Sequence, residues 1–341
     1  MKVGMYYRND DVRVEEQEVP TVGPGDVLLR VVSSGICGSD LMEWYRITRA
    51  PLVLGHEVTG EIVEVGEEVT WLRPGDRVFA THHVPCGECL YCLRGDETAC
   101  RTLQEVNNFS PGGFAEYVRV TGRSVRTGIL PLPDGVSYEE GTFIEPLATV
   151  VRGLRTTGLA PGDSVLVYGA GIAGILFVKL AKALGAGTVG VADVDGRRRE
   201  AALAAGADVG LAAGADVPER WVEHAGRAAD KVVICTGAPS AAEAALRSVD
   251  RGGTVLFFAV GRPGEALAVD FNPFWRNSVT LATSYGAAPL DNRQALELLA
   301  HGTVCVGDMV THRFALDEIG EAFRTAARAS DCLKVVVEPR R

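Results

Sequence analysis

Four cysteines within one short stretch have the spacing that points most directly to chemistry. They are Cys86, Cys89, Cys92 and Cys100. Four thiolates so close together can surround a zinc ion tetrahedrally and leave no open position, which is the arrangement of a structural zinc site. Two disulfides or an iron–sulfur cluster are the alternatives. The acidic composition and the lack of a secretory signal argue against disulfides, and we expect zinc in a loop that has little core of its own.

A second group of metal-binding residue types lies upstream of these cysteines. His56 and Glu57 follow a glycine, and such a pair alone is most often a turn exposed to solvent. Cys37 precedes them, close to two glycines, with Ser39 and Asp40 just behind it. Thiolate, imidazole and carboxylate groups are zinc ligands, and neighbouring polar side chains can orient them.

A glycine pattern at residues 169–174 indicates a dinucleotide-binding loop. Gly169, Gly171 and Gly174 form the pattern G-x-G-x-x-G, which Ile172 and Ala173 complete. A predicted strand precedes the loop and a predicted helix follows it, which is the context that the pattern needs. The glycines allow a tight turn, a close approach of a pyrophosphate and close packing of helix on strand, with the helix N-terminus facing the phosphates.

Asp193, at the end of the next predicted strand, bears on the choice between NAD and NADP. A carboxylate there can accept hydrogen bonds from the adenosine ribose and repel a 2′-phosphate, which favours NAD. Arg197, Arg198 and Arg199 follow, and arginines at this place can instead bind a 2′-phosphate. The alternative is a solvated first helical turn in which at most Arg198 touches the ribose. We expect NAD rather than NADP.

The elements that must hold these residues in place fall into three parts. Residues 1–150 contain many short strand candidates separated by Gly/Pro turns, typical of a barrel or sandwich. Residues 138–155 can be helical. Residues 151–284 alternate strands with helices, and this βαβ order predicts a doubly wound parallel sheet whose last strand covers 254–258. Residues 285–341 can rejoin the first part. Their two helix candidates and final strand cover 291–301, 317–329 and 334–337.

Length and composition narrow the class of protein. The chain has 341 residues, enough for two domains, and 47% of them are apolar, enough for a sizeable core. A net charge of −10 and a pI near 5.2 argue against nucleic acid or an anionic membrane as the main partner. Residues 1–11 do not form a secretory signal, and no apolar run is long enough to span a bilayer. We therefore expect a cytoplasmic protein.

Together these motifs resemble those of the zinc-containing medium-chain alcohol dehydrogenases. The resemblance rests on Gly55-His56-Glu57 with the glycines after it, on Cys37-Gly38-Ser39-Asp40 and on the four-cysteine stretch. It covers essentially the whole chain. The segment Glu145-Pro146-Leu147 is most similar to the polyol branch, which includes sorbitol (L-iditol) and threonine dehydrogenases. The resemblance implies an α/β fold: a GroES-like β-rich catalytic domain plus a Rossmann domain with a doubly wound parallel sheet.

The resemblance also implies two zinc ions per chain. The cysteine stretch would hold the structural ion, and Cys37, His56 and a carboxylate would hold the catalytic one. Glu57 is the third ligand that the sorbitol-type branch implies, with water as the fourth. Glu145 occupies the position where relatives place a further ligand or a nearby carboxylate, so both glutamates stay candidates and can exchange during turnover.

The implied proton path departs from the family pattern at Met42. Relatives often carry a histidine there, five residues after the cysteine, and a thioether cannot relay a proton. Ser39 would still be the first hydroxyl on the path, and Asp40 would orient His56. The substitutes for the missing histidine are Glu43, His82, His83 and bulk water.

The implied reaction is the transfer of a hydride from a secondary alcohol to NAD, which gives a ketone. Zinc would act as a Lewis acid on the oxygen of a polyol, cyclitol or sugar-derived alcohol, in a cleft between the domains. Thr236 and Val260, in loops after later strands, would line the nicotinamide ribose and carboxamide. Trp44, Tyr45 and Phe109 are pocket candidates that can equally be core.

Other functions stay open. The substrate can be threonine or a simple secondary alcohol. A zinc-independent reductase of the same superfamily would lack the metal-binding residues, and a catalytically silent nucleotide-binding or redox-sensing protein is an alternative of a different class. The family leads us to expect a homo-oligomer, a tetramer, acting on a small molecule without nucleic acid or membrane.

Overall fold

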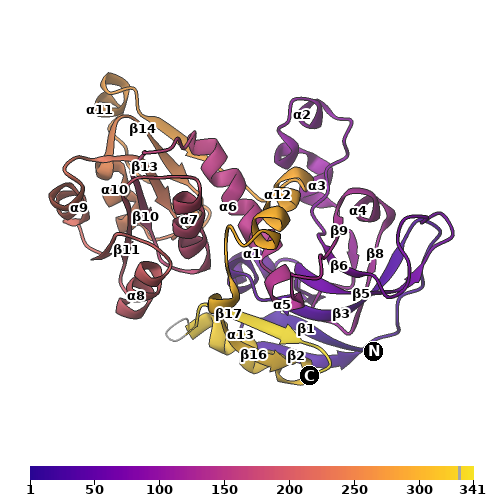
Figure 1. Cartoon of the computed structure of the whole chain (residues 1–341). Coiled ribbons are helices and arrows are strands. Elements are labelled where there is room, and N and C mark those ends of the chain that lie inside the picture. The colour runs from indigo at the N-terminus through magenta and orange to yellow at the C-terminus, as the bar shows by residue number, and fades with distance from the viewer. Residues whose placement is uncertain (329–331) are drawn as a thin grey trace. The chain divides into compact units, whose positions relative to one another are not determined.

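The chain folds into two compact units in a computed structural model that describes residues 1–328 and 332–341. Unit 1 comprises Met1–Ala148 and Gly286–Arg341, and unit 2 comprises Thr149–Tyr285. The C-terminal stretch therefore returns to the unit that contains the N-terminus, and both chain ends lie there (Figure 1). Over the described ranges, no helix combines the length and the apolar character needed to cross a membrane.

Unit 1 is built on a mostly antiparallel sheet of eight strands, counted over its described residues. The strands are β3 (Val27–Gly35), β5 (Glu57–Val65), β6 (Arg77–Ala80), β7 (Phe109–Ser110), β8 (Tyr117–Val120), β9 (Ile129–Pro131), β16 (Val310–Ala315) and β17 (Lys334–Glu338). Their order is β16-β17-β3-β5-β6-β9, and β8 pairs with both β3 and β7. A smaller sheet has the order β2-β1-β4, from Asp11–Glu16, Lys2–Arg8 and Leu52–Val53.

The period-two pattern of β3 and β5 explains why they form the centre of this sheet. Val27, Leu29 and Val31 alternate along β3, and all three are buried in one cluster with Val58 and Ile62 of β5. Successive side chains of a strand point to opposite faces, so this alternation directs one apolar face of each strand into the core.

The final strand, β17, lies beside β3 although the two are far apart in the sequence. Val336 pairs with Gly35 and Val337 with Ser34 in antiparallel register. Because the two strands run in opposite directions, the first residue of β17, Lys334, lies beyond the end of β3, next to the segment that carries Cys37. A residue near the C-terminus thus reaches the middle of unit 1.

Short helices connect the strands of unit 1. The α-helices are α1 (Glu43–Arg46), α2 (Leu90–Leu93), α3 (Arg101–Glu105), α4 (Gly122–Thr127), α5 (Tyr138–Gly141), α12 (Pro289–Ala300) and α13 (Ile319–Arg328), and α6 (Ile144–Thr157) runs across the boundary into unit 2. The 3-10 helices are η1 (Gly38–Leu41), η2 (Glu97–Ala99), η3 (Gly307–Met309) and η4 (Leu316–Glu318).

Unit 2, described throughout, contains a six-stranded sheet in which every strand pair is parallel. The order is β12-β11-β10-β13-β14-β15. These strands cover Val209–Ala212, Val189–Asp193, Val165–Tyr168, Ala229–Ile234, Val249–Phe257 and Thr280–Thr283. The strand order reverses around β10, which has β11 on one side and β13 on the other, and ligands of doubly wound sheets bind at such a switch point.

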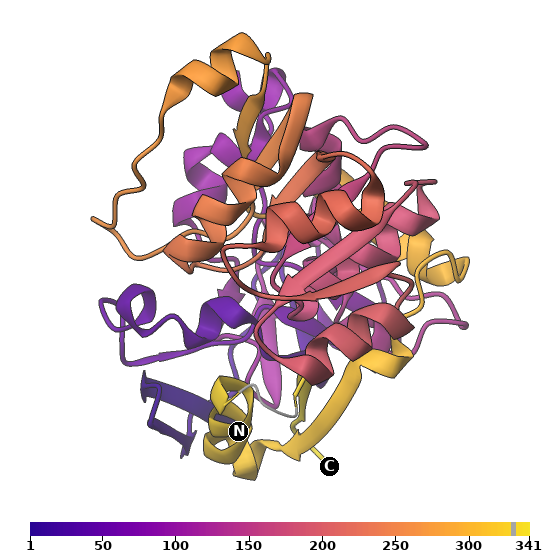
Figure 2. The ribbon, with the colours of Figure 1, turned by 90° about the vertical axis from the view of Figure 1, so that its left-hand side faces the viewer.

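Helices pack on both faces of the unit 2 sheet. They are α7 (Ile172–Ala183), α8 (Gly196–Ala204), α9 (Val217–Ala225), α10 (Pro239–Ser248) and α11 (Phe271–Arg276). Leu166 and Tyr168 of β10 are buried with Trp221 of α9, whereas Val167 lies 3.5 Å from the position of a Cβ on Gly174 of α7. Figure 2 shows these helices against the sheet, with the segment between β14 and α11 drawn as an extended orange loop.

The predicted fold class is confirmed, with differences in the elements. The stretch 138–155 is two helices, α5 and α6, and not one continuous helix. The sheet of unit 2 does not end at residues 254–258, because β15 is added beyond that strand, and β12 and α9 were not predicted. The helix predicted at 317–329 is η4 followed by α13, and Ala329 lies outside the described residues.

Candidate active site

Cys37, His56 and Glu57 bring their ligand atoms to within 4.8 Å of one another. Cys37 follows β3, and its sulfur accepts a hydrogen bond from the backbone N–H of Ser39 at the start of η1. Glu57 is the first residue of β5 and lies opposite Gly35 of β3. The end of one strand therefore meets the start of its neighbour, and the three donor atoms fit a zinc ion.

The turn at Gly55 sets the direction in which His56 leaves the backbone. Gly55 has a φ of 95°, a conformation that favours glycine, and a Cβ there would lie 2.7 Å from the backbone nitrogen of Phe114. Its carbonyl accepts a hydrogen bond of 2.8 Å from Gly113. A side chain at position 55 would push the 113–114 backbone away and displace the neighbouring imidazole.

Asp40 holds the imidazole of His56 from behind. Its Oδ1 lies 3.4 Å from His56 Nδ1, and its Oδ2 accepts a hydrogen bond of 3.1 Å from the backbone N–H of Cys37. Burial disfavours a charged His56, but the charges of Asp40 and Cys37 outweigh burial and raise the pKa of His56 well above its usual value. With Nδ1 turned to Asp40, Nε2 is the nitrogen left for a metal.

Glu57 is paired with a lysine that the sequence did not reveal as a site residue. Lys334 Nζ contacts Glu57 Oε2, and both side chains are 1% exposed. The same ammonium lies 3.4 Å from the carbonyl oxygen of Ile36 and 5.5 Å from the centre of the Phe143 ring. A Cβ on Gly35 would collide with the Glu57 carboxylate, so the pair depends on a glycine at this position of β3.

Glu145 lies near these residues but outside the group of three. It stands in the first turn of α6 and is 7% exposed. Burial raises the pKa of Glu145 to about 7, and the charges of Glu57 and Asp40 act in the same direction, against those of His56 and Lys334. Glu145 therefore carries a proton more readily than an ordinary glutamate, whereas Glu57 keeps a cation beside it.

Two histidines after β6 extend the site. The ring of His82 lies edge-on to that of His56, with centroids 5.4 Å apart, and its centroid lies 3.9 Å from that of the His83 ring, which is tilted by 35°. Burial lowers the pKa of both rings, to about 4 for His83, and the charges of His56 and Arg46 add to the effect. Both rings are therefore neutral near pH 7.

The other side chains predicted around the pocket differ in their exposure and in the residues that they contact. Phe109 is 5% exposed, with its ring centroid 5.8 Å from that of His82, whereas Trp44 is 37% exposed. Tyr45 lies beneath the guanidinium of Arg46. Glu43 is exposed and accepts a hydrogen bond of 2.9 Å from the backbone of Asn9. Glu43 thus binds the turn between β1 and β2.

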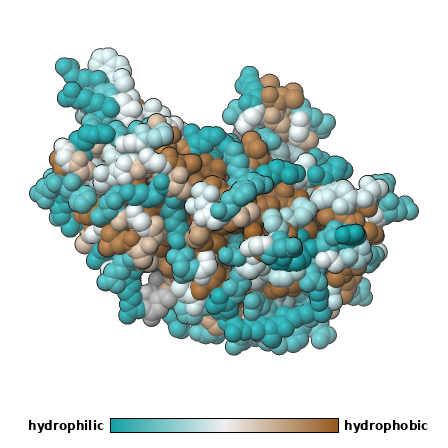
Figure 3. Space-filling model, viewed as in Figure 1, coloured by the Kyte–Doolittle hydropathy of each residue, from teal (hydrophilic) through white to brown (hydrophobic). Residues whose placement is uncertain are grey.

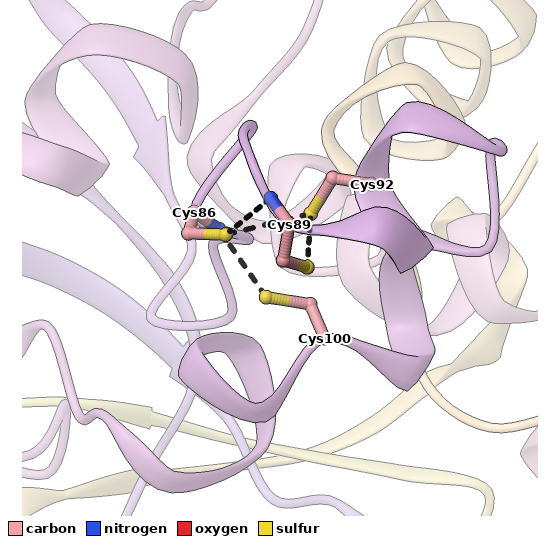
Figure 4. A group of neighbouring side chains, drawn as sticks. All are labelled: Cys86, Cys89, Cys92 and Cys100. Carbon is pink, nitrogen blue, oxygen red and sulfur yellow. Dashed lines mark hydrogen bonds between the residues drawn. The ribbon is translucent and has the colours of Figure 1, made fainter.

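The four cysteines of the predicted structural site converge on one point (Figure 4). Their sulfurs lie within 4.8 Å of one another, with Cys89 and Cys92 3.4 Å apart, and no disulfide forms between any of these described residues. Backbone N–H groups of Cys86 and Cys89 donate to neighbouring sulfurs. Burial raises the pKa of Cys92 to about 12, while hydrogen bonds outweigh burial and lower that of Cys100 to about 6. Four thiolates in one place need a cation.

The glycine loop has the geometry predicted from its pattern. Gly169 has a φ of 100° and donates a hydrogen bond of 2.8 Å to Ala192 of β11. A Cβ on Gly174 would collide with the Gly169 carbonyl, so helix and loop touch at backbone distance. A Cβ on Gly171 would meet open space, and this leaves room for a ligand at the N-terminus of α7, where Ile172 and Ala173 form the first turn.

Asp193 ties this loop to the end of β11. Its carboxylate is 6% exposed and accepts hydrogen bonds from the backbone N–H groups of Ala170, at 2.6 Å, and Asp195, at 2.8 Å. Arg199 turns back and donates to the Asp193 carbonyl oxygen at 2.7 Å. Arg198 is half-buried, and its backbone N–H is capped by Asp195.

The two later loops of unit 2 lie against each other. Val260 is 59% exposed, and its carbonyl oxygen would be 2.9 Å from a Cβ on Gly237. Thr236, half-buried, accepts a hydrogen bond of 3.4 Å from Ala238. Thr236 and Val260 therefore belong to one surface after β13 and β14, which is consistent with the predicted cofactor contact.

Comparison with known proteins supports both units. Residues 23–134 match the alcohol dehydrogenase GroES-like domain, and residues 173–301 match the zinc-binding dehydrogenase family. Sorbitol dehydrogenase from Bacillus subtilis is 32% identical, over 100% of this chain and 98% of the relative.

Two solved structures share the fold over nearly their whole length. Alcohol dehydrogenase TADH from Thermus sp. ATN1 has a TM-score of 0.88 at 29% identity and covers 99% of both chains. A putative zinc-binding dehydrogenase from Sinorhizobium meliloti, bound to NADP, has a TM-score of 0.89 at 29% identity, again over 99% of both chains. Since the likeness spans both units and includes relatives that act on sugar alcohols by name, the chain belongs to the polyol branch of the zinc-containing medium-chain alcohol dehydrogenases.

Proposed function

We propose that this chain oxidises a polyol, a cyclitol or a sugar-derived secondary alcohol to a ketone and passes the hydride to NAD. The observation that carries the proposal is the convergence of Cys37, His56 and Glu57 on one point of unit 1. The family supports the oxidation of an alcohol with zinc and a nicotinamide cofactor. The substrate class and the choice of NAD are the parts that we add.

The protein's own residues hold and orient the reacting groups. Cys37 and His56 would bind the catalytic zinc, with Asp40 fixing the tautomer and the angle of His56. When bound, zinc lowers the pKa of an alcohol oxygen as a Lewis acid, and nicotinamide accepts the hydride. Ser39 places its hydroxyl 3.4 Å from the Cys37 sulfur, within reach of an oxygen bound beside it.

Glu57 is our candidate for the third zinc ligand. Its Oε2 faces Lys334, which leaves Oε1 for a metal, and its carboxylate belongs to the group of converging donors. Glu145 ranks second. Its pKa is raised by burial, and such a carboxyl must lose its proton before it can bind a metal. Glu57, in contrast, already lies beside a cation, the Lys334 ammonium, and this supports Glu57 as the ligand.

The four-cysteine lobe would hold a second, structural zinc. The short distances between its sulfurs and the N–H groups aimed at them support this proposal. Metal analysis of the purified protein tests it: we expect two zinc ions per chain, and one ion after Cys37→Ser. A value of one in the unchanged protein would favour a catalytically silent nucleotide-binding protein.

NAD is the cofactor that Asp193 supports. A buried carboxylate at the end of β11 repels a 2′-phosphate. The structure from Sinorhizobium meliloti is bound to NADP, so a protein of this fold can bind the phosphorylated cofactor. Arg198, near the same strand end, is the residue through which NADP would gain affinity.

The experiment that tests the function is a substrate panel. Polyols, cyclitols, sugar acids, threonine and simple secondary alcohols are offered with NAD and with NADP, and the absorbance of reduced nicotinamide is followed. We expect turnover with a polyol or sugar-derived alcohol and NAD, and its loss in Cys37→Ser. Activity that survives this substitution would mean that the reaction does not use the proposed zinc site.

Two further features complete the proposal. We propose a homo-oligomer, a tetramer, supported by exposed apolar residues such as Leu93 at the tip of the cysteine lobe, 73% exposed, and Trp275 of α11, 80% exposed. Figure 3 shows the hydrophobic tip of the lobe in brown.

We also propose a cytoplasmic location, supported by eight described cysteines that form no disulfide. Light scattering of the purified protein and cell fractionation test these two points.

A further inference from the structure

Arg46, the last residue of α1, contacts two side chains that flank the candidate zinc ligands. Its Nε donates to the backbone carbonyl of Ser39 at 3.0 Å, and its Nη2 donates to Ser39 Oγ, also at 3.0 Å. The same Nη2 lies 3.4 Å from Asp40 Oδ1. The side chain is only 14% exposed, and it lies over the ring of Tyr45. One guanidinium therefore spans Ser39 and Asp40.

The contact with Ser39 determines where the serine proton can point. A guanidinium donates hydrogen bonds and accepts none, so Arg46 occupies a lone pair of Ser39 Oγ and the hydroxyl proton turns away from it. The Cys37 sulfur, 3.4 Å from Ser39 Oγ, is the acceptor on the other side. Arg46 thus aims the Ser39 hydroxyl at the ligand group.

This role differs from that of the histidine that relatives often carry at position 42. A histidine can take up a proton, whereas an arginine stays charged and cannot. Arg46 therefore does not replace a proton acceptor. It makes Ser39 a fixed donor, and such a donor stabilises negative charge on an oxygen bound next to Cys37.

The contact with Asp40 reaches the metal ligand His56. Asp40 is 0% exposed, and its Oδ1 faces both Arg46 and His56 Nδ1 at 3.4 Å. A buried carboxylate needs such partners to stay in place. Without Arg46, this carboxylate would keep the imidazole and the backbone N–H of Cys37, and lose the cation that shares Oδ1 with the imidazole.

We propose that Arg46 is a positioning residue of the active site, which directs the Ser39 hydroxyl toward the reacting oxygen and braces Asp40 behind His56. The proposal rests on the alcohol oxidation proposed above. It predicts that substitution of Arg46 changes turnover, although Arg46 is not one of the three converging candidate ligands.

The test combines turnover with a measurement that needs none. We expect Arg46→Gln to lower kcat about 10- to 100-fold, the effect of losing charge-assisted hydrogen bonds, with KM changed less than about threefold. In a Ser39→Ala background, the same substitution should lower kcat clearly less than in the unchanged chain, because the Ser39 hydroxyl is gone and only the support of Asp40 remains to be lost. Transfer of the catalytic metal to a chromogenic chelator should be about 10-fold faster in Arg46→Gln. Arg46→Lys should recover part of both losses.

The neighbouring Arg49 provides a matched control. It also lies over the Tyr45 ring, at 5.6 Å, but is exposed, so Arg49→Gln should leave kcat and metal transfer unchanged. Circular dichroism and the melting temperature check that each variant is folded. If Arg46→Gln does not fold, the same measurements are made with Arg46→Lys. The proposal requires both the coupling with Ser39 and the faster metal transfer. If the kcat losses of Arg46→Gln and Ser39→Ala simply multiply in the double variant, or if metal transfer is unchanged, the proposal is wrong. If the unchanged protein oxidises no alcohol, the proposed function fails, and the metal transfer still decides whether Arg46 braces the site.

Discussion

Lys334 and Glu57 form a buried ion pair that joins the last strand of the chain to the candidate metal ligands. Each side chain is 1% exposed, so neither charge is solvated by water. The pair exists because β17 lies beside β3 and extends past its end. Removing one member therefore leaves the other charge buried without its partner.

Lys334→Met should destabilise the metal-free protein by about 3–5 kcal/mol, since the Glu57 carboxylate would lose its counter-charge. The free energy of unfolding in urea, measured with chelator present, checks this value. The double variant Lys334→Met, Glu57→Gln removes both charges and should recover most of the loss. If Lys334→Met alone is as stable as the unchanged chain, the ion pair does not contribute as the structure indicates.

Glu57 and Glu145 can be distinguished by metal retention. Glu57→Gln should release the catalytic metal to a chelator about 10- to 100-fold faster, because a ligand is lost. Glu145→Gln should change the rate by less than about threefold, since this carboxyl is outside the group of converging donors. Inductively coupled plasma mass spectrometry after dialysis gives the same comparison at equilibrium. The reverse order would make Glu145 the third ligand.

The cysteine lobe should depend on its metal for order. Chelation, or Cys89→Ser, removes the ion or one of its proposed ligands, and we expect faster proteolytic cleavage within residues 80–110 while the rest of the chain stays intact. Mass spectrometry of the fragments locates the cut sites. Cys305→Ser is the control, because this exposed thiol lies outside the lobe. Equal cleavage of the lobe with and without metal would contradict a structural zinc site.

Asp230 should make the stability of unit 2 sensitive to acid. It accepts hydrogen bonds from Ser164 N and Oγ at 2.8 and 2.9 Å and pairs with Arg227. Burial alone would raise the pKa of Asp230, but these contacts lower it to about 2, below the value of about 3.9 in an unfolded chain. The group therefore stabilises the fold above about pH 4 and ceases to do so as the pH falls toward 2.

After allowance for solvent screening, this contribution is about 1 kcal/mol. The difference in unfolding free energy between the unchanged chain and Asp230→Asn, measured in urea between pH 6 and 2.5, isolates it from other acidic groups. We expect the difference to be largest near neutral pH and to shrink in acid. A difference that grows as the pH falls would have the wrong sign.

Asp193 should control the cofactor preference. Asp193→Ser removes the charge but keeps an acceptor for the backbone N–H of Ala170, so the loop should keep its shape. We expect the ratio of kcat/KM for NAD to that for NADP to fall by about tenfold or more, as repulsion of the 2′-phosphate is lost. Asp195→Ser, a change in the neighbouring helix cap, is the control and should leave the ratio unchanged.

The sequence predicts best those parts of the site that need special residue types at short spacing. The cysteine lobe and the glycine loop are local, and the sulfurs and backbone positions that they require leave a pattern within fifteen residues. Only the family resemblance predicts that Cys37 and His56 lie together, because their proximity depends on the pairing of β3 with β5. The chemistry of the donors alone left a solvated turn as the simpler interpretation.

Two residues of the site were missed for physical reasons. Lys334 reads as the polar first residue of a final strand, and nothing near it in the sequence shows that β17 inserts beside β3. Arg46 sits seven residues after Ser39, and only the fold of η1 and α1 turns its side chain back toward that serine. The sequence indicates that residues 138–155 can be helical, and they are, but propensity does not reveal the interruption between α5 and α6.

The place of β17 also affects how the protein is made. Ribosomes deliver the chain from the N-terminus, so Cys37, His56 and Glu57 emerge long before Lys334. Until Lys334 has emerged, Glu57 lacks the cation that lies beside it in the interior of unit 1. A chain cut short before residue 334 would thus leave Glu57, a candidate metal ligand, without its counter-charge.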